Sequence, residues 1–213
     1  MKRLRDPVSS ITHMIGAIAA IPGLVFLILY ALKYGTTIHL VSYVVFGISL
    51  ILLYSASATY HGVTVKDSII KIFRKIDHMM IFVLIAGTYT PICLVALKGT
   101  LGYALLIAIW ILAIVGIVLK ALWMNMPRWV SAVIYIAMGW FAIVAIVQLV
   151  TNLSTAALIL LVAGGICYTI GGVIYGSKRS FINFKHFGFH ELFHIFVMFG
   201  SACHYFMVIN LIK

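Results

Sequence analysis

The sequence predicts an all-α integral membrane protein, a bundle of seven transmembrane helices with the N-terminus in the cytoplasm and the C-terminus outside. Of the 213 residues, 64% are hydrophobic and only 9% are charged, and the mean hydropathy is +1.19. In an average soluble domain about 25% of residues are charged. The apolar residues also fall in blocks of about twenty, the length that crosses a bilayer core. These blocks cannot supply the polar surface that a soluble protein needs.

The first three apolar blocks are separated by short polar segments. Residues 11–32 lack a small-residue cleavage site at their end, so we expect a retained membrane helix and not a removed signal peptide. A second helix is predicted over 39–61, and part of the basic loop after it can form a short interfacial helix. The third predicted helix spans 77–96, with Pro91 as a kink near its far end.

Tight turns connect the next blocks, which predict helices over 101–124, 129–150 and 155–175. Glycine pairs within 155–175 indicate close approach of a neighbouring helix. A second basic loop leads to the seventh predicted helix, 186–209. No long linker or low-complexity tract divides the chain, so residues 1–213 are expected to form a single domain.

Lysine and arginine lie mostly in alternate loops. Twelve of the 15 fall on the side of the N-terminus and three on the other side, which predicts a cytoplasmic N-terminus by the positive-inside rule. Membrane topology thus explains the net charge of +11, which does not indicate nucleic-acid binding. The three cysteines all lie within apolar blocks, so the sequence predicts no disulfide framework and no cysteine metal site.

Four ionisable residues are predicted to meet at the cytoplasmic end of the bundle. His190 and His194 are four residues apart at the start of the seventh helix, which places both imidazoles on one face. His61 ends the second helix and Asp77 begins the third, so all four can lie within about 10 Å of one depth. Because ionisable residues inside membrane spans are costly and usually functional, this convergence predicts a site.

Three neutral imidazoles with an open fourth position resemble the ligand set of catalytic zinc sites. We therefore predict that zinc is bound by His61, His190 and His194. Asp77 is predicted to orient the attacking water or to take its proton. Ser57 lies four residues before His61 on the same helix face, and its hydroxyl group can bond a ligand imidazole, the water or a developing oxyanion.

Other interpretations of these residues stay open. A single histidine near a helix end is more often interfacial or hydrogen-bonded than a ligand, and a serine in a span more often bonds its own backbone. We adopt the first interpretation for the remaining histidines, which are His13, His39, His78, His186 and His204. Residues 190–194 also match the H-E-x-x-H motif of zinc proteases, in which Glu191 would be the base. Alternatively, Glu191 complements the dipole at the start of the helix.

Several motifs of this sequence resemble those of the hemolysin III family, the bacterial branch of the progestin and adipoQ receptors. They occur in the order that the family pattern has, at residues 10–17, 55–61, 75–78 and 190–194, with the later His204. The resemblance covers about residues 9–209. It implies a multi-pass protein of a bacterial plasma membrane, with zinc held by His61, His190 and His194 near the cytoplasmic leaflet and Asp77 acting through water.

The wider superfamily includes alkaline ceramidases, which hydrolyse lipid amides, so the resemblance implies a zinc-dependent hydrolase of a lipid amide or ester bond. Two alternatives stay open: a membrane-damaging cytolysin, as the family name says, and a lipid sensor in which zinc is structural. The sequence shows no polar stripe along several spans, which argues against a pore. The expected partner is a membrane lipid, as substrate or ligand, and the sequence indicates no nucleic acid, no protein partner and no particular oligomeric state.

Overall fold

The computed structural model describes residues 4–123, 125–182, 184 and 187–212. Within them, seven helical segments are long and apolar enough to cross a membrane, which confirms the predicted seven-span all-α bundle. In chain order the elements are α1 (Pro7–Tyr34), α2 (Thr37–Gly62), α3 (Asp67–Pro91), the π-helix η1 (Ile92–Leu97), α4 (Gly99–Leu122), α5 (Arg128–Gly139), the 3-10 helix η2 (Trp140–Ala145), α6 (Ile146–Asn152), α7 (Thr155–Ser177) and α8 (Phe189–Ile209). The third span combines α3 with η1, and the fifth combines α5, η2 and α6.

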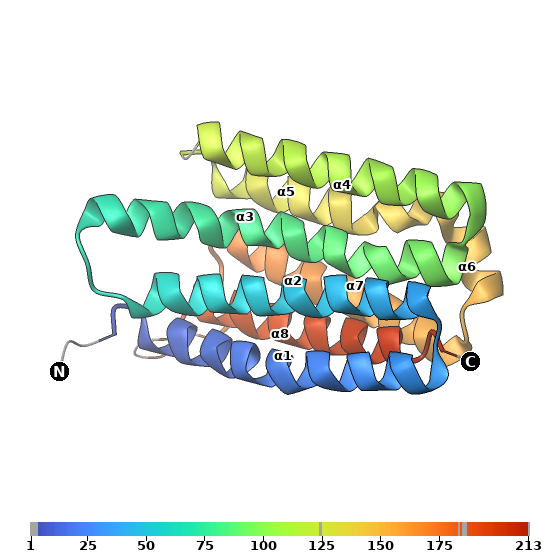
Figure 1. Cartoon of the computed structure of the whole chain (residues 1–213). Coiled ribbons are helices and arrows are strands. Elements are labelled where there is room, and N and C mark those ends of the chain that lie inside the picture. The colour runs from blue at the N-terminus through green and yellow to red at the C-terminus, as the bar shows by residue number, and fades with distance from the viewer. Residues whose placement is uncertain (1–3, 124, 183, 185–186, 213) are drawn as a thin grey trace.

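The two termini lie at opposite ends of the bundle, as an odd number of crossings requires (Figure 1). The end at which α1, α3, α5 and α8 begin and α2, α4 and α7 end is called the basic end below, because most of the lysines and arginines belong to it. Its assignment to the cytoplasmic side stays a prediction from the charge count.

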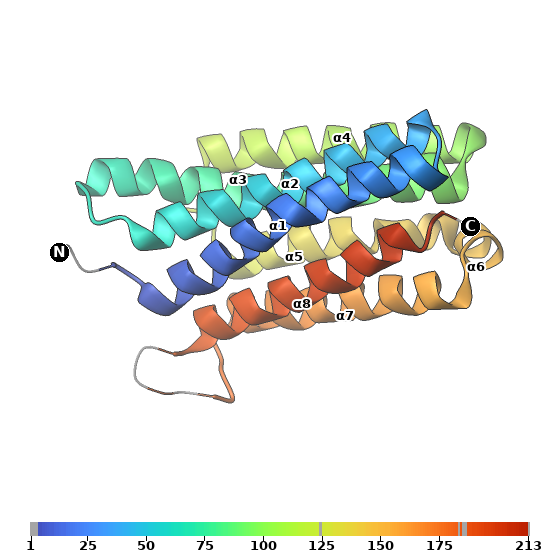
Figure 2. The same cartoon turned by 60° about the horizontal axis from the view of Figure 1, so that its bottom comes forward.

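Six of the spans form a ring. Helix α1 packs against α2 and α8, α2 against α3, α3 against α5, α5 against α7 and α7 against α8, while α4 packs against α3 and η1 outside this ring. Figure 2 shows α1 and α8 side by side on the near face. The chain therefore brings its first and last spans into contact, and this contact shapes the site described below.

The third helix begins ten residues earlier than the predicted residue 77. Helix α3 starts at Asp67 and extends past α2 at the basic end (Figure 1). Residues 67–76 alternate isoleucine and phenylalanine with lysine and arginine, so their mean hydropathy is low although their pattern is helical. Lysine and arginine stems can lie along the apolar boundary with their charges in water. A continuous amphipathic helix therefore replaces the predicted basic loop.

The fifth span is not the continuous helix predicted over 129–150, because its middle is the 3-10 segment η2. Tyr89 of α3 occupies the break: its hydroxyl group donates to the Gly139 carbonyl at 2.7 Å and accepts from the Ala142 amide at 2.7 Å. The kink predicted at Pro91 takes the form of the π-helix η1, which starts at the next residue. The other predicted boundaries agree with the described ones to within four residues.

The close helix approach predicted from the glycines of α7 is confirmed. A Cβ atom at Gly164 would collide with the ring of His204 on α8, so only a glycine lets the two helices come this close. A cavity lies inside the ring and is described in the next section.

Candidate metal centre

Three histidines from two helices meet at the basic end. His61 comes from the last turn of α2, and His190 and His194 come from the first two turns of α8. One ligand atom of each lies within 4.8 Å of the other two, and the Nε2 atoms of His61 and His190 are 3.1 Å apart. His61 and His194 are buried, and His190 is half-buried. The structure thus brings together the three residues that the sequence predicts as ligands.

The geometry of this cluster fits a metal ion. Two imidazole nitrogens bound to one tetrahedral zinc at about 2.0 to 2.1 Å are separated by about 3.3 Å, close to the separation of the His61 and His190 Nε2 atoms. The Nδ1 atom of His194 is buried and has no hydrogen-bond partner among the described residues. Three neutral nitrogen donors suit zinc or another divalent transition metal, so the cluster can hold a metal ion.

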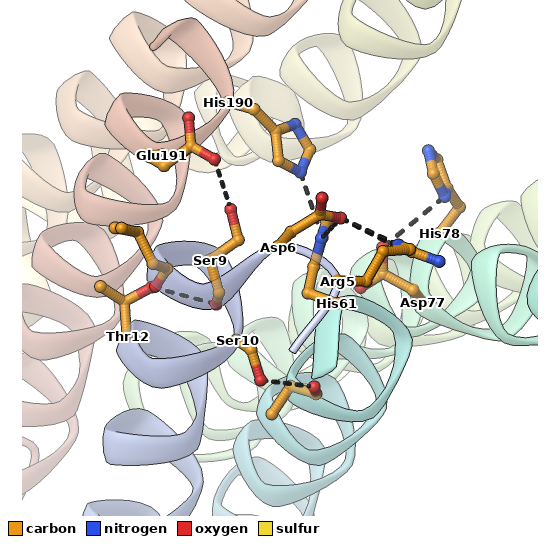
Figure 3. A network of polar contacts seen from close by, with 12 residues as sticks. Arg5, Asp6, Ser9, Ser10, Thr12, His61, Asp77, His78, His190 and Glu191 are labelled. Carbon is orange, nitrogen blue, oxygen red and sulfur yellow. Dashed lines mark hydrogen bonds and ion pairs between the residues drawn. The ribbon is translucent and has the colours of Figure 1, made fainter. Parts of the chain in front are cut away.

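Asp6 sets the proton position on His61. The Asp6 Oδ2 atom lies 3.0 Å from His61 Nδ1 (Figure 3), and because an ionised carboxylate only accepts hydrogen bonds, Nδ1 carries the proton. Nε2 of His61 then keeps its lone pair toward His190, as in the carboxylate–histidine–metal arrangement of known metal sites. Partial burial acts to raise the pKa of Asp6, but the hydrogen bond from His61 and the adjacent Arg5 guanidinium outweigh it and hold that pKa below its ordinary value.

The sequence reasoning did not find Asp6. An aspartate directly before a proline at a helix start is typical of an N-cap, and Asp6 occupies the N-cap position of α1. In the structure its side chain makes no capping bond, and its backbone amide donates to the His61 carbonyl at 2.9 Å. The Asp6 side chain therefore points toward the end of α2. This orientation depends on the packing of α1 against α2, which the sequence pattern does not show.

His13 is also part of the centre, contrary to the interfacial role predicted for it. Its ring stacks on that of His194 with centroids 3.7 Å apart and planes 10° from parallel. It is 3% exposed, and neither ring nitrogen has a hydrogen-bond partner within the described part of the chain. His13 is buried because α1 packs against α8, and its ring restricts the orientation of the His194 imidazole.

Asp77 and Ser57 both lie beside the histidine cluster. Both are buried and line the same cavity as His190 and His194. The Ser57 hydroxyl lies near the Asp77 carboxyl group. It makes no well-formed hydrogen bond to any described residue. The alternative that Ser57 bonds its own backbone is therefore wrong, and the hydroxyl group is available to a ligand.

The remaining histidines do not join the cluster. His78 uses Nδ1 to donate to the Arg74 carbonyl at 2.7 Å and pairs through Nε2 with the Tyr175 hydroxyl at 3.0 Å. His39 interacts with Thr36 at the start of α2, and His204 contacts a backbone carbonyl of α7. The hydrogen-bonded role predicted for these three is confirmed, and His186 lies outside the described residues.

Glu191 ties α1 to α8 instead of facing the histidines. One carboxylate oxygen accepts from the Ser9 hydroxyl at 2.8 Å (Figure 3). The other accepts from the Gly188 amide at 2.9 Å. The second contact is half of a capping box at the start of α8. Both oxygens are thus engaged in structural bonds, which favours the helix-start interpretation of Glu191 over the general base of a protease.

A cavity extends from the histidine cluster into the bundle. It comprises about 1090 Å³ of space free of protein atoms, including its open part, and residues of α1, α2, α3, α5, η2, α7 and α8 line it. Asp77, His190 and His194 lie toward the basic end, while Thr88, Trp140 and His204 lie farther along these helices. Most of the wall is apolar side chain, so the cavity suits a hydrocarbon chain whose polar end meets the cluster.

Replacing Asp6 by alanine is expected to weaken zinc binding about 10- to 100-fold, the usual effect of losing a carboxylate behind a ligand histidine. Competition with a chromophoric chelator measures the affinity. Asp67→Ala, which removes an exposed carboxylate at the start of α3, is the matched control and should bind zinc as the wild-type protein does. Equal affinities in Asp6→Ala and Asp67→Ala would show that Asp6 does not support the centre.

Comparison with known proteins identifies relatives along nearly the whole chain. Residues 1–205 match a family model described as Haemolysin-III related. The chain is 44% identical over 201 residues to the Hemolysin-3 homolog of Bacillus subtilis (strain 168), covering 94% of this chain and 91% of that protein. It is 42% identical to Hemolysin-3 of Bacillus cereus over 94% and 89% of the two chains. The human Monocyte to macrophage differentiation factor is 28% identical over 168 residues, or 77% and 67% of the two chains.

Proposed function

We propose, from the premise that this chain belongs to the haemolysin-III related family, that it is a zinc-dependent hydrolase of an amide or ester bond in a membrane lipid. We place it in the plasma membrane of a bacterium. One observation carries the proposal: the cluster of His61, His190 and His194 lies at the end of an apolar cavity that also presents Asp77 and Ser57. A ligand set, a candidate base and an apolar space thus share one site.

Each residue of the site has a different role in the proposed hydrolysis. Bound zinc supplies Lewis-acid chemistry, since it polarises a carbonyl group and makes water a better nucleophile. In this proposal Asp77 accepts the proton of the attacking water and returns it to the leaving group. The unpaired Ser57 hydroxyl can donate a hydrogen bond to the negative charge that develops on the carbonyl oxygen. The apolar wall of the cavity holds the lipid chain and excludes bulk water from it.

The test is a lipid-release assay on purified protein reconstituted in phosphatidylcholine vesicles that contain a ceramide and an encapsulated dye. The proposal predicts release of free fatty acid that stops with a chelator and returns with added zinc, while the dye stays inside. Dye loss without fatty acid would instead support the cytolysin that the names of the two Bacillus relatives suggest. Bound zinc with no fatty acid from any amide or ester lipid would support the sensor.

Glu191→Gln is expected to keep lipid hydrolysis within a few-fold of the wild-type rate. Glutamine can still accept the Gly188 amide hydrogen bond through its carbonyl oxygen and complete a capping box, and its NH2 group can donate to the Ser9 hydroxyl. It cannot act as a general base. The assay described above measures the rate, and zinc content is checked in the same sample. A loss of more than about 100-fold with zinc retained would restore the protease-like role of Glu191.

A further inference from the structure

A second, smaller hollow at the basic end is lined largely by cations. It lies between α3, α4, the loop that precedes α5, and α7, and is called the basic pocket here. Its lining residues are Arg74, Lys75, His78, Lys120, Met126 and Tyr175. Three of the six carry a full positive charge, and the proposed hydrolytic function uses none of these three.

Lys120 is a buried cation without a counter-ion. It lies in the last turn of α4 and is 6% exposed. Its ammonium group donates to the Ser131 hydroxyl at 2.6 Å, which satisfies one of its three protons. A buried charge is costly unless it is paired, and the structure shows no carboxylate paired with Lys120 among the described residues.

The chain has four carboxylate side chains, and each is placed elsewhere. Asp6 contacts Arg5 and His61, and Glu191 bonds Ser9 and Gly188. Asp67 is exposed at the start of α3, and Asp77 faces the large cavity and lies 3.7 Å from His78 Nδ1. The positive charge of the basic pocket is therefore not neutralised by the protein itself.

The other two cations are held around the same space. Lys75 donates to the Ala121 carbonyl at 2.7 Å, which fixes its ammonium group at the end of α4. Arg74 lines the pocket, and its guanidinium group makes no hydrogen bond to any described residue. Arg128 adds further charge nearby, because its guanidinium carbon lies 5.8 Å from the centre of the Tyr175 ring. The site therefore favours an anion with several acceptor oxygens.

The basic pocket adjoins the large cavity. His78 and Tyr175 line both spaces and are hydrogen-bonded to each other at 3.0 Å. The pocket also lies at the end of the bundle, where lipid phosphates are found, and basic pockets between spans bind such headgroups. A single lipid can thus place a phosphate in one space and a hydrocarbon chain in the other.

We propose that the basic pocket binds the phosphoryl group of the lipid whose chain occupies the cavity, so that the substrate is a phosphate-bearing lipid. This inference rests on the proposed hydrolase function and names its substrate class. Several charge-assisted hydrogen bonds to one phosphoryl group would neutralise Lys120, Lys75 and Arg74 together.

Calorimetry on detergent-purified protein in the presence of a chelator tests the pocket without turnover. Dihexanoyl phosphatidic acid is expected to bind at least about tenfold more tightly than dihexanoylglycerol. Lys120→Met should lower that preference by about tenfold, because one of the three cations that bind the phosphoryl group is lost. Methionine keeps the apolar stem and removes a buried charge, so the variant should fold. Lys71→Met removes an exposed lysine of α3 that does not line the pocket and should leave the preference intact.

Three outcomes would overturn the inference: equal binding of the two lipids, a preference that is undiminished in Lys120→Met, or inorganic phosphate binding as tightly as the lipid through Lys120. The last would assign the pocket to the free anion. The two proposals can fail separately. Lys120-dependent lipid binding without any hydrolysis would refute the hydrolase alone, whereas hydrolysis of neutral lipids that is unchanged in Lys120→Met would refute the pocket alone.

Discussion

Purified His194→Ala protein is expected to contain almost no zinc, whereas the wild-type protein should contain about one zinc ion per chain. His194 is buried among the other candidate ligands and under the ring of His13, so its loss removes one of the three nitrogen ligands from the centre. Elemental analysis of detergent-purified samples measures the metal. His190→Ala removes the half-buried member of the cluster and should have the same effect with less disturbance of packing.

His39→Ala is the matched control for these variants. His39 lies at the start of α2, at the opposite end of the bundle from the cluster, and its loss should leave zinc content unchanged. Size-exclusion profiles and helix content separate the loss of a ligand from the loss of the fold. A well-folded His194→Ala protein that retains a full complement of zinc would show that the metal binds elsewhere.

Asp77→Asn is expected to lower the rate of lipid hydrolysis by about 10²- to 10⁴-fold while zinc content stays at the wild-type level. Asparagine has the same shape as aspartate but cannot accept a proton from the attacking water. Asp77 is not among the three candidate ligands, so its replacement should not release the metal. Fatty acid release and elemental analysis on the same preparation measure the two effects.

Asp67→Asn is the control for this variant, because Asp67 lies on the same helix but is exposed at its start. It should leave both the rate and the zinc content unchanged. If Asp77→Asn lost its zinc, Asp77 would be a ligand and not a base. If it kept both zinc and turnover, the site would need another proton acceptor.

The seven spans could be predicted from the sequence because span length and hydropathy are local properties. The start of α3 could not, since residues 67–76 mix apolar and basic side chains and resemble a loop when hydropathy is averaged. The break in the fifth span depends on Tyr89, which comes from a different helix. No pattern within 129–150 indicates it.

The three candidate ligands could be predicted because the spacing of His190 and His194 and the position of His61 at a helix end combine with the topology. Asp6 and His13 could not be found in this way. Both belong to the start of α1, and their role depends on the contact of α1 with α2 and α8. That contact closes the ring of helices and is a property of the whole fold, which local spacing does not encode.

The proposed centre consists of one zinc ion bound by His61, His190 and His194. X-ray absorption at the zinc edge of the purified wild-type protein identifies the ligands, because nitrogen and sulfur lie at different distances from the metal. We expect histidine nitrogens at about 2.0 Å and no sulfur. A sulfur shell at about 2.3 Å would place the metal on cysteine and refute the assignment. A spectrum without the outer scattering of imidazole rings would refute it as well.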